Sequence, residues 1–148
     1  MVLRSISSHI MPKDSPRNKE PGPVQPRIDL FSGCEFARMM GFSVIEAREG
    51  YARICMAADG KRNPHGVIHG GAIFTLADQA FALAANTGGS DRVAVSANIQ
   101  FIAPASGDLE AVATYVGNFG KYFTYRIVIT EGKRLIAVFD GTSLQISP

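Results

Sequence analysis

The chain is organised around one segment, His69-Gly70-Gly71-Ala72-Ile73-Phe74-Thr75-Leu76-Ala77-Asp78-Gln79-Ala80-Phe81-Ala82-Leu83-Ala84-Ala85-Asn86. Its Ala- and Leu-rich composition predicts one helix that starts at the paired glycines and ends at Asn86, before the stop signal Gly88-Gly89. Apolar residues lie all round this helix, which is typical of a helix buried in a core. At about 25 Å it matches the width of a small domain, and it is too short and too polar to span a membrane.

Length and charge predict one folded domain preceded by a tail. The 148 residues suffice for a single hydrophobic core. Residues 1–27 hold five Lys/Arg, two Asp/Glu and five of the eight prolines, so we expect a disordered basic tail there and the folded domain at 28–148. The folded part holds ten basic and eleven acidic residues, which gives no electrostatic reason to expect a nucleic-acid partner.

Cysteine usage and the lack of an apolar leader predict a cytoplasmic protein. The first residues contain no apolar run of the length that a secretory signal needs. Cys34 and Cys55 have no metal-binding or redox spacing, and we expect both to be small buried hydrophobic residues with reduced thiols.

The pattern around the central segment predicts an α+β fold. Residues 30–40 favour a short helix that ends at Gly41, and residues 42–58 alternate as a hairpin or bulged strand around Gly50. Strands are expected at 93–101, 109–116, 123–129 and 135–146. Because short turns separate them, we expect each of these strands to lie antiparallel beside the next. The result would be a curved antiparallel sheet of about five or six strands wrapped around one long helix.

The faces of two strands carry further expectations. In 93–101 strict alternation puts one apolar row on one face and Ser96, Asn98 and Gln100 on the other. The apolar row is Val93, Val95, Ala97, Ile99 and Phe101. Apolar residues occur on both faces of 109–116, and a second subunit is the simplest cover for the outer face.

Two features of the central segment oppose its stability and suggest chemistry. Gly70 and Gly71 each weaken a helix by up to about 1 kcal/mol relative to Ala. They also let a ligand approach backbone N–H groups whose partial positive charge suits an oxyanion, although a tight turn would explain them too. Asp78 is the only charge in the helix; burial would raise its pKa towards that of a general base, and the alternative is a structural carboxylate.

Helix geometry then makes a prediction about assembly. Gly70 and Asp78 are eight residues apart, which is about 12 Å along a helix axis. One reacting carbonyl cannot lie about 3 Å from both groups of the same helix. If both groups act in one reaction, they must come from two chains with antiparallel helices, so an enzyme would be a dimer with composite sites.

Polar residues outside the helix are weaker candidates. Asn63 before Pro64 is a plausible turn residue, but its amide could instead orient a water or a substrate carbonyl. His65 and His69 straddle Gly66 and have no third ligand nearby, so we expect no metal. Ser96 lacks a G-x-S-x-G context and is not expected to be a nucleophile.

These residues together resemble a known family. The run Asn63-Pro64-His65-Gly66-Val67-Ile68-His69-Gly70-Gly71, followed by Asp78 and Ser96 at their spacing, is similar to hotdog-fold thioesterases of the phenylacetyl-CoA thioesterase (PaaI) type. The phrases at 97–105, 120–121 and 135–143 also fit, so the resemblance covers residues 30–146. Gln79 and Ala103 depart from the family pattern, where a small residue and a basic residue are frequent.

The resemblance implies an acyl-CoA thioesterase for aryl-acyl or medium-chain acyl groups, assembled as a homodimer or homotetramer. It implies that the Gly70 N–H polarises the thioester carbonyl, that His69 supports that loop and that Asn63 positions the carbonyl or water. Asp78 of the partner chain would be nucleophile or general base, and Ser96 would orient the water or that carboxylate. Substrate contacts would come from Gly71, Lys61, Arg62 and Lys121, and coenzyme A is part of the substrate, so no cofactor is expected.

Two other classes remain as alternatives. A hotdog enoyl-CoA hydratase or dehydratase would need a His/Asp pair at the β-carbon, and the Asp-x-Asn-Pro-x-His arrangement that would supply it is missing from the sequence. A non-catalytic acyl-CoA binding module would bind ligand without turnover.

Overall fold

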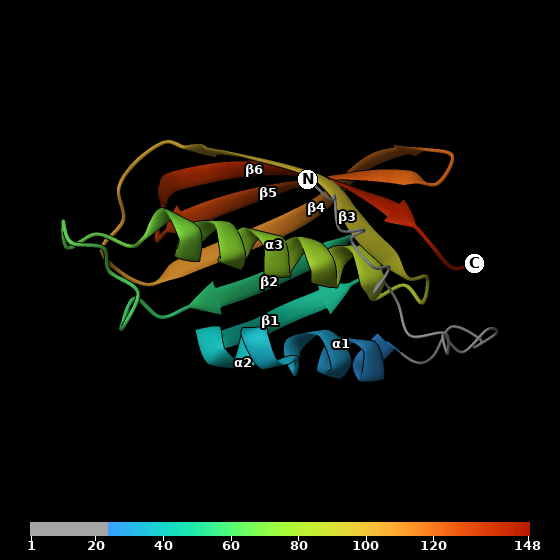
Figure 1. Ribbon diagram of the computed structural model, residues 1–148, viewed down its shortest axis with the longest axis horizontal. Helices are drawn as coiled ribbons and strands as arrows, with labels where there is room; N and C mark the ends of the chain where they lie inside the picture. The colour runs from blue at the N-terminus through green and yellow to red at the C-terminus, as the bar shows by residue number, and fades with distance from the viewer. Residues whose placement is uncertain (1–23) are drawn as a thin grey trace, which may run out of the picture.

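A computed structural model of the chain describes residues 24–148 as a six-stranded antiparallel sheet with one long helix lying across its inner face (Figure 1). The elements in chain order are α1 (Val24–Ser32), α2 (Glu35–Met40), β1 (Phe42–Arg48), β2 (Tyr51–Met56), α3 (Gly70–Asn86), β3 (Arg92–Phe101), β4 (Leu109–Phe119), β5 (Tyr122–Glu131) and β6 (Arg134–Gln145). The strand order is β1-β2-β4-β5-β6-β3. The predicted α+β class, with a central helix and about six strands, is confirmed.

Helix α3 has the predicted bounds, from Gly70 to Asn86. Its sheet-facing side is fully buried, with Leu76, Ala80 and Leu83 at zero exposure, and Phe81 packs against the rings of Tyr125 and Phe139. The expectation that the helix is enclosed all round is wrong for the single chain. A stripe on its other side is only half-buried, and it consists of Thr75, Asp78, Gln79 and Ala82.

The inner face of the sheet is a close-packed apolar layer. Rows of paired residues run across it, such as Ile54, Ala111 and Ile129, and all three are fully buried. On β6 a side chain at Gly141 would lie 2.9 Å from the rings of Phe81 and Phe139, so only glycine fits beneath the helix there. The core therefore fixes how α3 sits on the sheet.

The expectation that every strand lies beside the next is wrong for β3 and β4. Strand β3 pairs with β6 at one edge of the sheet, whereas β4 pairs with β2 and β5 in its interior. Residues 102–108 cross between the two positions past the N-terminal end of α3 (Figure 1). A connection of seven residues is long enough to leave an edge strand, so a short loop did not imply a hairpin.

The expected faces of 93–101 are also partly wrong, because β3 has a bulge. Its register against β6 shifts between Ala94 and Ser96, leaving Val95 as the extra residue. One extra residue reverses the alternation. Ile99 and Phe101 lie on the expected face, opposite Phe139 and Ala137, although Phe101 at the end of the strand is 53% exposed. Val93 and Val95 leave that row, and they are 44% and 50% exposed.

The N-terminal part folds as two helices where one was expected at 30–40. Helix α1 starts at Val24, so residues 24–27 of the expected tail are helical; residues 1–23 lie outside the described part of the chain. Gly33 lies in the break between α1 and α2, where its N–H donates to the Asp29 carbonyl oxygen at 2.9 Å and a side chain would lie 2.6 Å from that oxygen. Cys34 in this break is exposed and Cys55 is half-buried, so the expectation of two buried cysteines is wrong.

Among residues 24–148, no helix is long and apolar enough to cross a membrane.

Candidate functional site

The site residues gather at the N-terminal end of α3, on a loop that holds itself in place. Asn63 closes this loop: its N–H donates to the Val67 carbonyl at 2.8 Å, and its side-chain Oδ1 accepts from the N–H of His65 at 2.9 Å. This is the turn role considered for Asn63. The carboxamide NH₂ of Asn63 has no acceptor among the described residues, so it remains a donor for another group.

His69 is the N-cap of α3 and accounts for three of its first N–H groups. The His69 Nδ1 atom accepts from the Gly71 N–H at 2.9 Å, and the His69 carbonyl oxygen accepts from Ala72 and Ile73. Within residues 24–148, the Gly70 N–H alone of these first four has no acceptor. A free N–H at the positive end of a 17-residue helix suits a developing oxyanion.

The ring of Phe101, at the end of β3, explains the glycine at position 70. A side chain at Gly70 would lie 3.3 Å from this ring, closer than ordinary contact. Glycine therefore lets the end of β3 pack directly against the first turn of α3.

A pocket of about 460 Å³ opens beside this helix end. Its lining residues come from α2, the loop and the first turns of α3, and they are Met40, Gly60, Lys61, Arg62, His69, Gly71, Ala72 and Thr75. The lining combines apolar surface from Met40 and Ala72 with two cationic side chains, so it suits a ligand with an apolar part and an anionic part.

Asp78 lies two turns further along α3, on the half-buried stripe. No hydrogen bond or ion pair to its carboxylate is found within the described residues, and burial raises its pKa above the ordinary value for an aspartate. An unpaired, partly desolvated carboxylate is a costly group to keep, and a raised pKa is what a general base needs. Since α3 is continuous, Asp78 stays about 12 Å along the axis from Gly70.

Comparison with known proteins identifies the family. A family model described as the thioesterase superfamily matches residues 65–137, from the loop before α3 into β6. Over 121 residues the chain is 34% identical to the acyl-coenzyme A thioesterase PaaI of Escherichia coli, covering 79% of this chain and 86% of that protein. The chain belongs to the thioesterase superfamily.

Solved structures agree with this assignment. The E. coli PaaI protein from the phenylacetic acid degradation operon matches with a TM-score of 0.78 and 29% identity, over 84% of this thioesterase and 94% of that chain. A point mutant of the phenylacetic acid degradation protein PaaI from Thermus thermophilus matches with a TM-score of 0.73 and 32% identity, over 76% of this thioesterase and 100% of that chain. The resemblance to PaaI-type hotdog thioesterases is confirmed.

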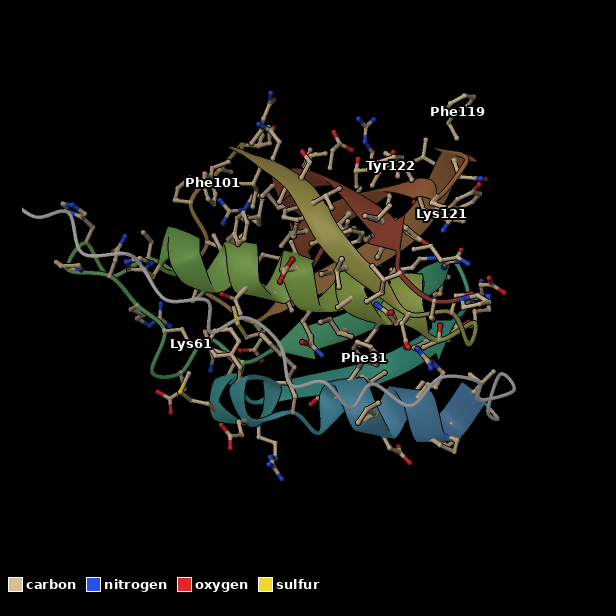
Figure 2. All side chains as sticks on the ribbon, turned by 45° about the vertical axis from the view of Figure 1, so that its right-hand side comes forward. Phe31, Lys61, Phe101, Phe119, Lys121 and Tyr122 are labelled. Carbon is tan, nitrogen blue, oxygen red and sulfur yellow. The ribbon has the colours of Figure 1, made fainter. Side chains whose placement is uncertain are left out.

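The structure brings most of the expected site residues of this thioesterase together, and separates three. Asn63, Lys61, Arg62, His69, Gly70 and Gly71 all lie at the N-terminal end of α3. Asp78 is further along the helix, and Ser96 is exposed on the edge strand β3, opposite Thr142. Lys121 lies in the β4–β5 turn, at the opposite end of the molecule from Lys61 (Figure 2).

Sequence reasoning missed three residues of this thioesterase that shape the site. Met40 and Thr75 line the pocket, and Phe101 packs against Gly70. Thr75 had a usable signal, because it lies three residues before Asp78 and four after Gly71 on one helix face. Met40 and Phe101 reach the site only through the tertiary fold, and nothing local marks them.

Proposed function

We propose that this thioesterase hydrolyses acyl-CoA thioesters with aryl-acyl or medium-chain acyl groups, and releases the free acid and coenzyme A. The observation that carries the proposal is the unpaired Gly70 N–H at the start of α3, beside a pocket with apolar and cationic lining. The name of the E. coli relative, acyl-coenzyme A thioesterase, supports the same substrate class.

The Gly70 N–H would hold the thioester carbonyl oxygen and stabilise the negative charge that forms on it. As general base, the Asp78 carboxylate takes a proton from water while the water oxygen attacks the carbonyl carbon. As nucleophile, the carboxylate itself attacks, and water then hydrolyses the mixed anhydride. In both routes the C–S bond breaks, the thiolate leaves and takes up a proton, and the acid is released.

The site would be shared between two subunits, because Gly70 and Asp78 of one helix cannot reach one carbonyl. Antiparallel α3 helices related by a two-fold axis bring Gly70 of one subunit beside Asp78 of the other. The axis then passes halfway between these positions, next to Phe74. The half-buried stripe of α3, which carries Asp78, supports such a contact because a second subunit would complete its cover.

The edge of the sheet supplies a means of pairing. Strand β3 is an edge strand, and Val93, Val95 and Phe101 are 44%, 50% and 53% exposed on it. An uncovered edge strand with apolar side chains is a template for another strand. Pairing β3 with its copy would extend the sheet and place the two α3 helices on one face. Association of such dimers into tetramers is a further part of the proposal.

Substrate contacts follow from this arrangement. Lys61 and Arg62 at the pocket would meet phosphate groups of coenzyme A, and Lys121 would reach the site only from the second subunit. Gly71 lines the pocket beside the oxyanion donor, and His69 keeps the Gly71 N–H occupied. The free amide of Asn63 would position the carbonyl or water.

Ser96 would take part from the edge strand, at the point where a second subunit approaches. The proposal needs no cofactor beyond the coenzyme A of the substrate. It places the enzyme in the cytoplasm, in keeping with the free cysteines Cys34 and Cys55.

Free-thiol release from a panel of acyl-CoAs tests the proposal. The panel includes acetyl-, octanoyl-, palmitoyl-, benzoyl- and phenylacetyl-CoA, with wild type beside Asp78→Ala. We expect release by wild type and a loss of at least about 10²-fold in the variant, equal to about 2.7 kcal/mol of barrier. Asp140→Ala on the outer face is the control and should keep its activity.

Three outcomes would contradict the proposal or part of it. Hydration of an enoyl-CoA without thiol release would show a hydratase, and tight acyl-CoA binding without turnover would show a binding module. Equal thiol release by wild type and Asp78→Ala would show that Asp78 has no role in catalysis.

A further inference from the structure

Residues 102–108, here called the crossover segment, hydrogen-bond to the loop before α3 at both ends of that loop. The Ala105 carbonyl oxygen accepts from the Ile68 N–H at 2.7 Å, two residues before Gly70. The Asp108 carboxylate accepts from the Ala58 N–H at 2.8 Å, at the other end of the loop. Figure 1 shows the crossover segment beside this loop, at the end of the molecule where α3 begins. The crossover segment is thus the surface against which the loop and the first turn of α3 are set.

One carboxylate at the end of β5 holds the crossover segment. Glu131 Oε1 accepts from the Ser106 N–H at 2.9 Å and from the Gly107 N–H. Its Oε2 pairs with the Arg134 guanidinium, which also donates to the Pro104 carbonyl oxygen at 2.8 Å. These bonds tie three residues of the crossover segment, Pro104, Ser106 and Gly107, to one ion pair, on both sides of Ala105.

The local sequence fits this arrangement. A side chain at Gly107 would lie 3.0 Å from Glu131 Oε1, so glycine lets the carboxylate approach the backbone. The Gly107 and Ser106 N–H groups, followed by Arg134, lower the pKa of Glu131 to about 2, so this carboxylate is charged at neutral pH. A permanently charged acceptor for two backbone N–H groups makes a stable anchor.

We infer that Glu131 is a positioning residue for the oxyanion donor, acting through the crossover segment on the Gly70 N–H. The inference rests on the proposed function, in which that N–H binds the thioester oxygen. The path has two hydrogen-bonded steps, from Glu131 to residues 106–107 and from Ala105 to Ile68. The ring of Phe101, just before the crossover segment, lies 3.3 Å from the position that a Cβ on Gly70 would take.

Position matters more than stability in this arrangement. The Glu131–Arg134 pair is partly open to solvent, with 23% and 51% of the two side chains exposed. Pairs of that kind add little to global stability. A displacement of about 1 Å at a catalytic group, by contrast, can cost about 10²-fold in rate. We therefore expect loss of Glu131 to lower kcat clearly while it changes the melting temperature little.

The test compares Glu131→Ala, Glu131→Gln and wild type, with Asp140→Asn as the matched control. Asp140 also forms a bidentate ion pair with an arginine, Arg126, but it has no contact with the crossover segment. Two readouts are measured well below the melting temperature: the kcat and KM of acyl-CoA hydrolysis, and the amide hydrogen exchange of residues 66–72.

We expect Glu131→Ala to lower kcat by at least about tenfold with KM within about twofold, and to speed exchange at the Ile68 amide. Glu131→Gln should recover part of both effects, because its amide oxygen still accepts the two N–H groups. Asp140→Asn should change neither. If Glu131→Ala does not fold, Glu131→Gln and Arg134→Gln carry the same comparison.

Unchanged Ile68 exchange in the Glu131 variants would overturn the inference, and so would faster exchange with wild-type kcat. An equal fall of kcat in Asp140→Asn would also overturn it. If wild type releases no thiol, the proposed function fails by itself, and Ile68 exchange alone decides the positioning claim, since that readout does not need catalysis.

Discussion

At the scale of single residues, Gly70 offers a hydrogen-bond donor and Asp78 a negatively charged acceptor, and both lie on one helix without a partner among residues 24–148. The Gly70 N–H is an unpaired donor at the positive end of α3, and Asp78 is a partly desolvated acceptor without a partner among the described residues. The partly desolvated Asp78 carboxylate reduces stability. A substrate carbonyl and a water, placed between two subunits, would satisfy both.

Comparing Gly70→Pro with Gly70→Ala separates the effect of losing the N–H from the effect of adding a Cβ at this position. Both substitutions place a Cβ near the Phe101 ring, but only proline removes the N–H. Proline is tolerated at the first helical position, and His69 before it already has the extended backbone that proline prefers, at φ −61° and ψ 133°. We expect Gly70→Pro to lower kcat by about 10²- to 10³-fold relative to Gly70→Ala. Equal rates of thiol release in the two variants would exclude this N–H as the oxyanion donor.

The pH dependence of the reaction should follow Asp78. Because burial raises its pKa, the acid limb of kcat/KM should have its midpoint above the ordinary aspartate value of about 3.9, with activity falling as the pH falls through it. The sign for stability is opposite: the folded protein binds this proton more readily than the unfolded chain, so this group favours folding at low pH and opposes it at higher pH.

Asp78→Asn should therefore be inactive yet unfold at a higher urea concentration than wild type at neutral pH, with the difference shrinking as the pH falls. Urea unfolding at two pH values, beside a pH–rate profile, measures both. A destabilised Asp78→Asn would mean that the carboxylate has a stabilising partner in the assembled protein.

At the scale of elements, the two ends of α3 are built differently. The N-terminal end is open and faces a pocket, whereas the C-terminal end is closed by arginines. Arg92 is 9% exposed; its guanidinium donates to the Ala85 carbonyl at 2.7 Å and to Tyr125 Oη at 3.3 Å, and it lies 4.0 Å from the centre of the Phe123 ring. A cation at the negative end of a helix stabilises it. The helix is thus anchored at one end and available for chemistry at the other.

Arg92→Met should remove this anchor. The change leaves the Ala85 carbonyl without its donor in a buried place, and we expect a loss of about 3 kcal/mol in the free energy of unfolding. Arg126→Met is the control: the Arg126–Asp140 pair is exposed on the sheet surface, and its loss should have a much smaller effect. Urea unfolding of the two variants under the same conditions makes the comparison. Similar losses would show that Arg92 contributes no more than a surface ion pair.

At the scale of the whole molecule, β3 is an edge strand whose outer side pairs with no other strand among residues 24–148, and a stripe on α3 is only half-buried. Both features point to the same missing neighbour, because pairing β3 with its copy brings two α3 helices together. If Gly70 and Asp78 act on one carbonyl, as proposed, the length of α3 requires a dimer with composite sites for any acyl group.

Mixed subunits test the composite site directly. Gly70→Pro and Asp78→Asn are each expected to be inactive alone. In a mixed dimer one site combines the intact Gly70 of one chain with the intact Asp78 of the other, and the second site has neither. Co-refolding equal amounts gives half mixed dimers with one working site in two, so about a quarter of wild-type activity should return. No recovery, in a preparation shown to contain mixed dimers, would mean that each chain holds its own site.

What the sequence alone determined is local. The bounds of α3, the positions of the strands and the candidate donor and carboxylate depend on composition, glycine placement and periodicity, which act over a few residues. The separation of about 12 Å between Gly70 and Asp78 is also local, since one helix links them.

What only the tertiary structure decided depends on long-range pairing. The chain's passage from β3 at the edge to β4 inside the sheet, the bulge that turns Val93 and Val95 outward, and the open stripe of α3 all reflect which strand lies beside which. So does the contact of Glu131 with Ser106, across 25 residues of sequence. Backbone pairing between distant strands sets these features, and neighbouring residues carry little information about the distant partner because any strand presents the same N–H and C=O groups to the next.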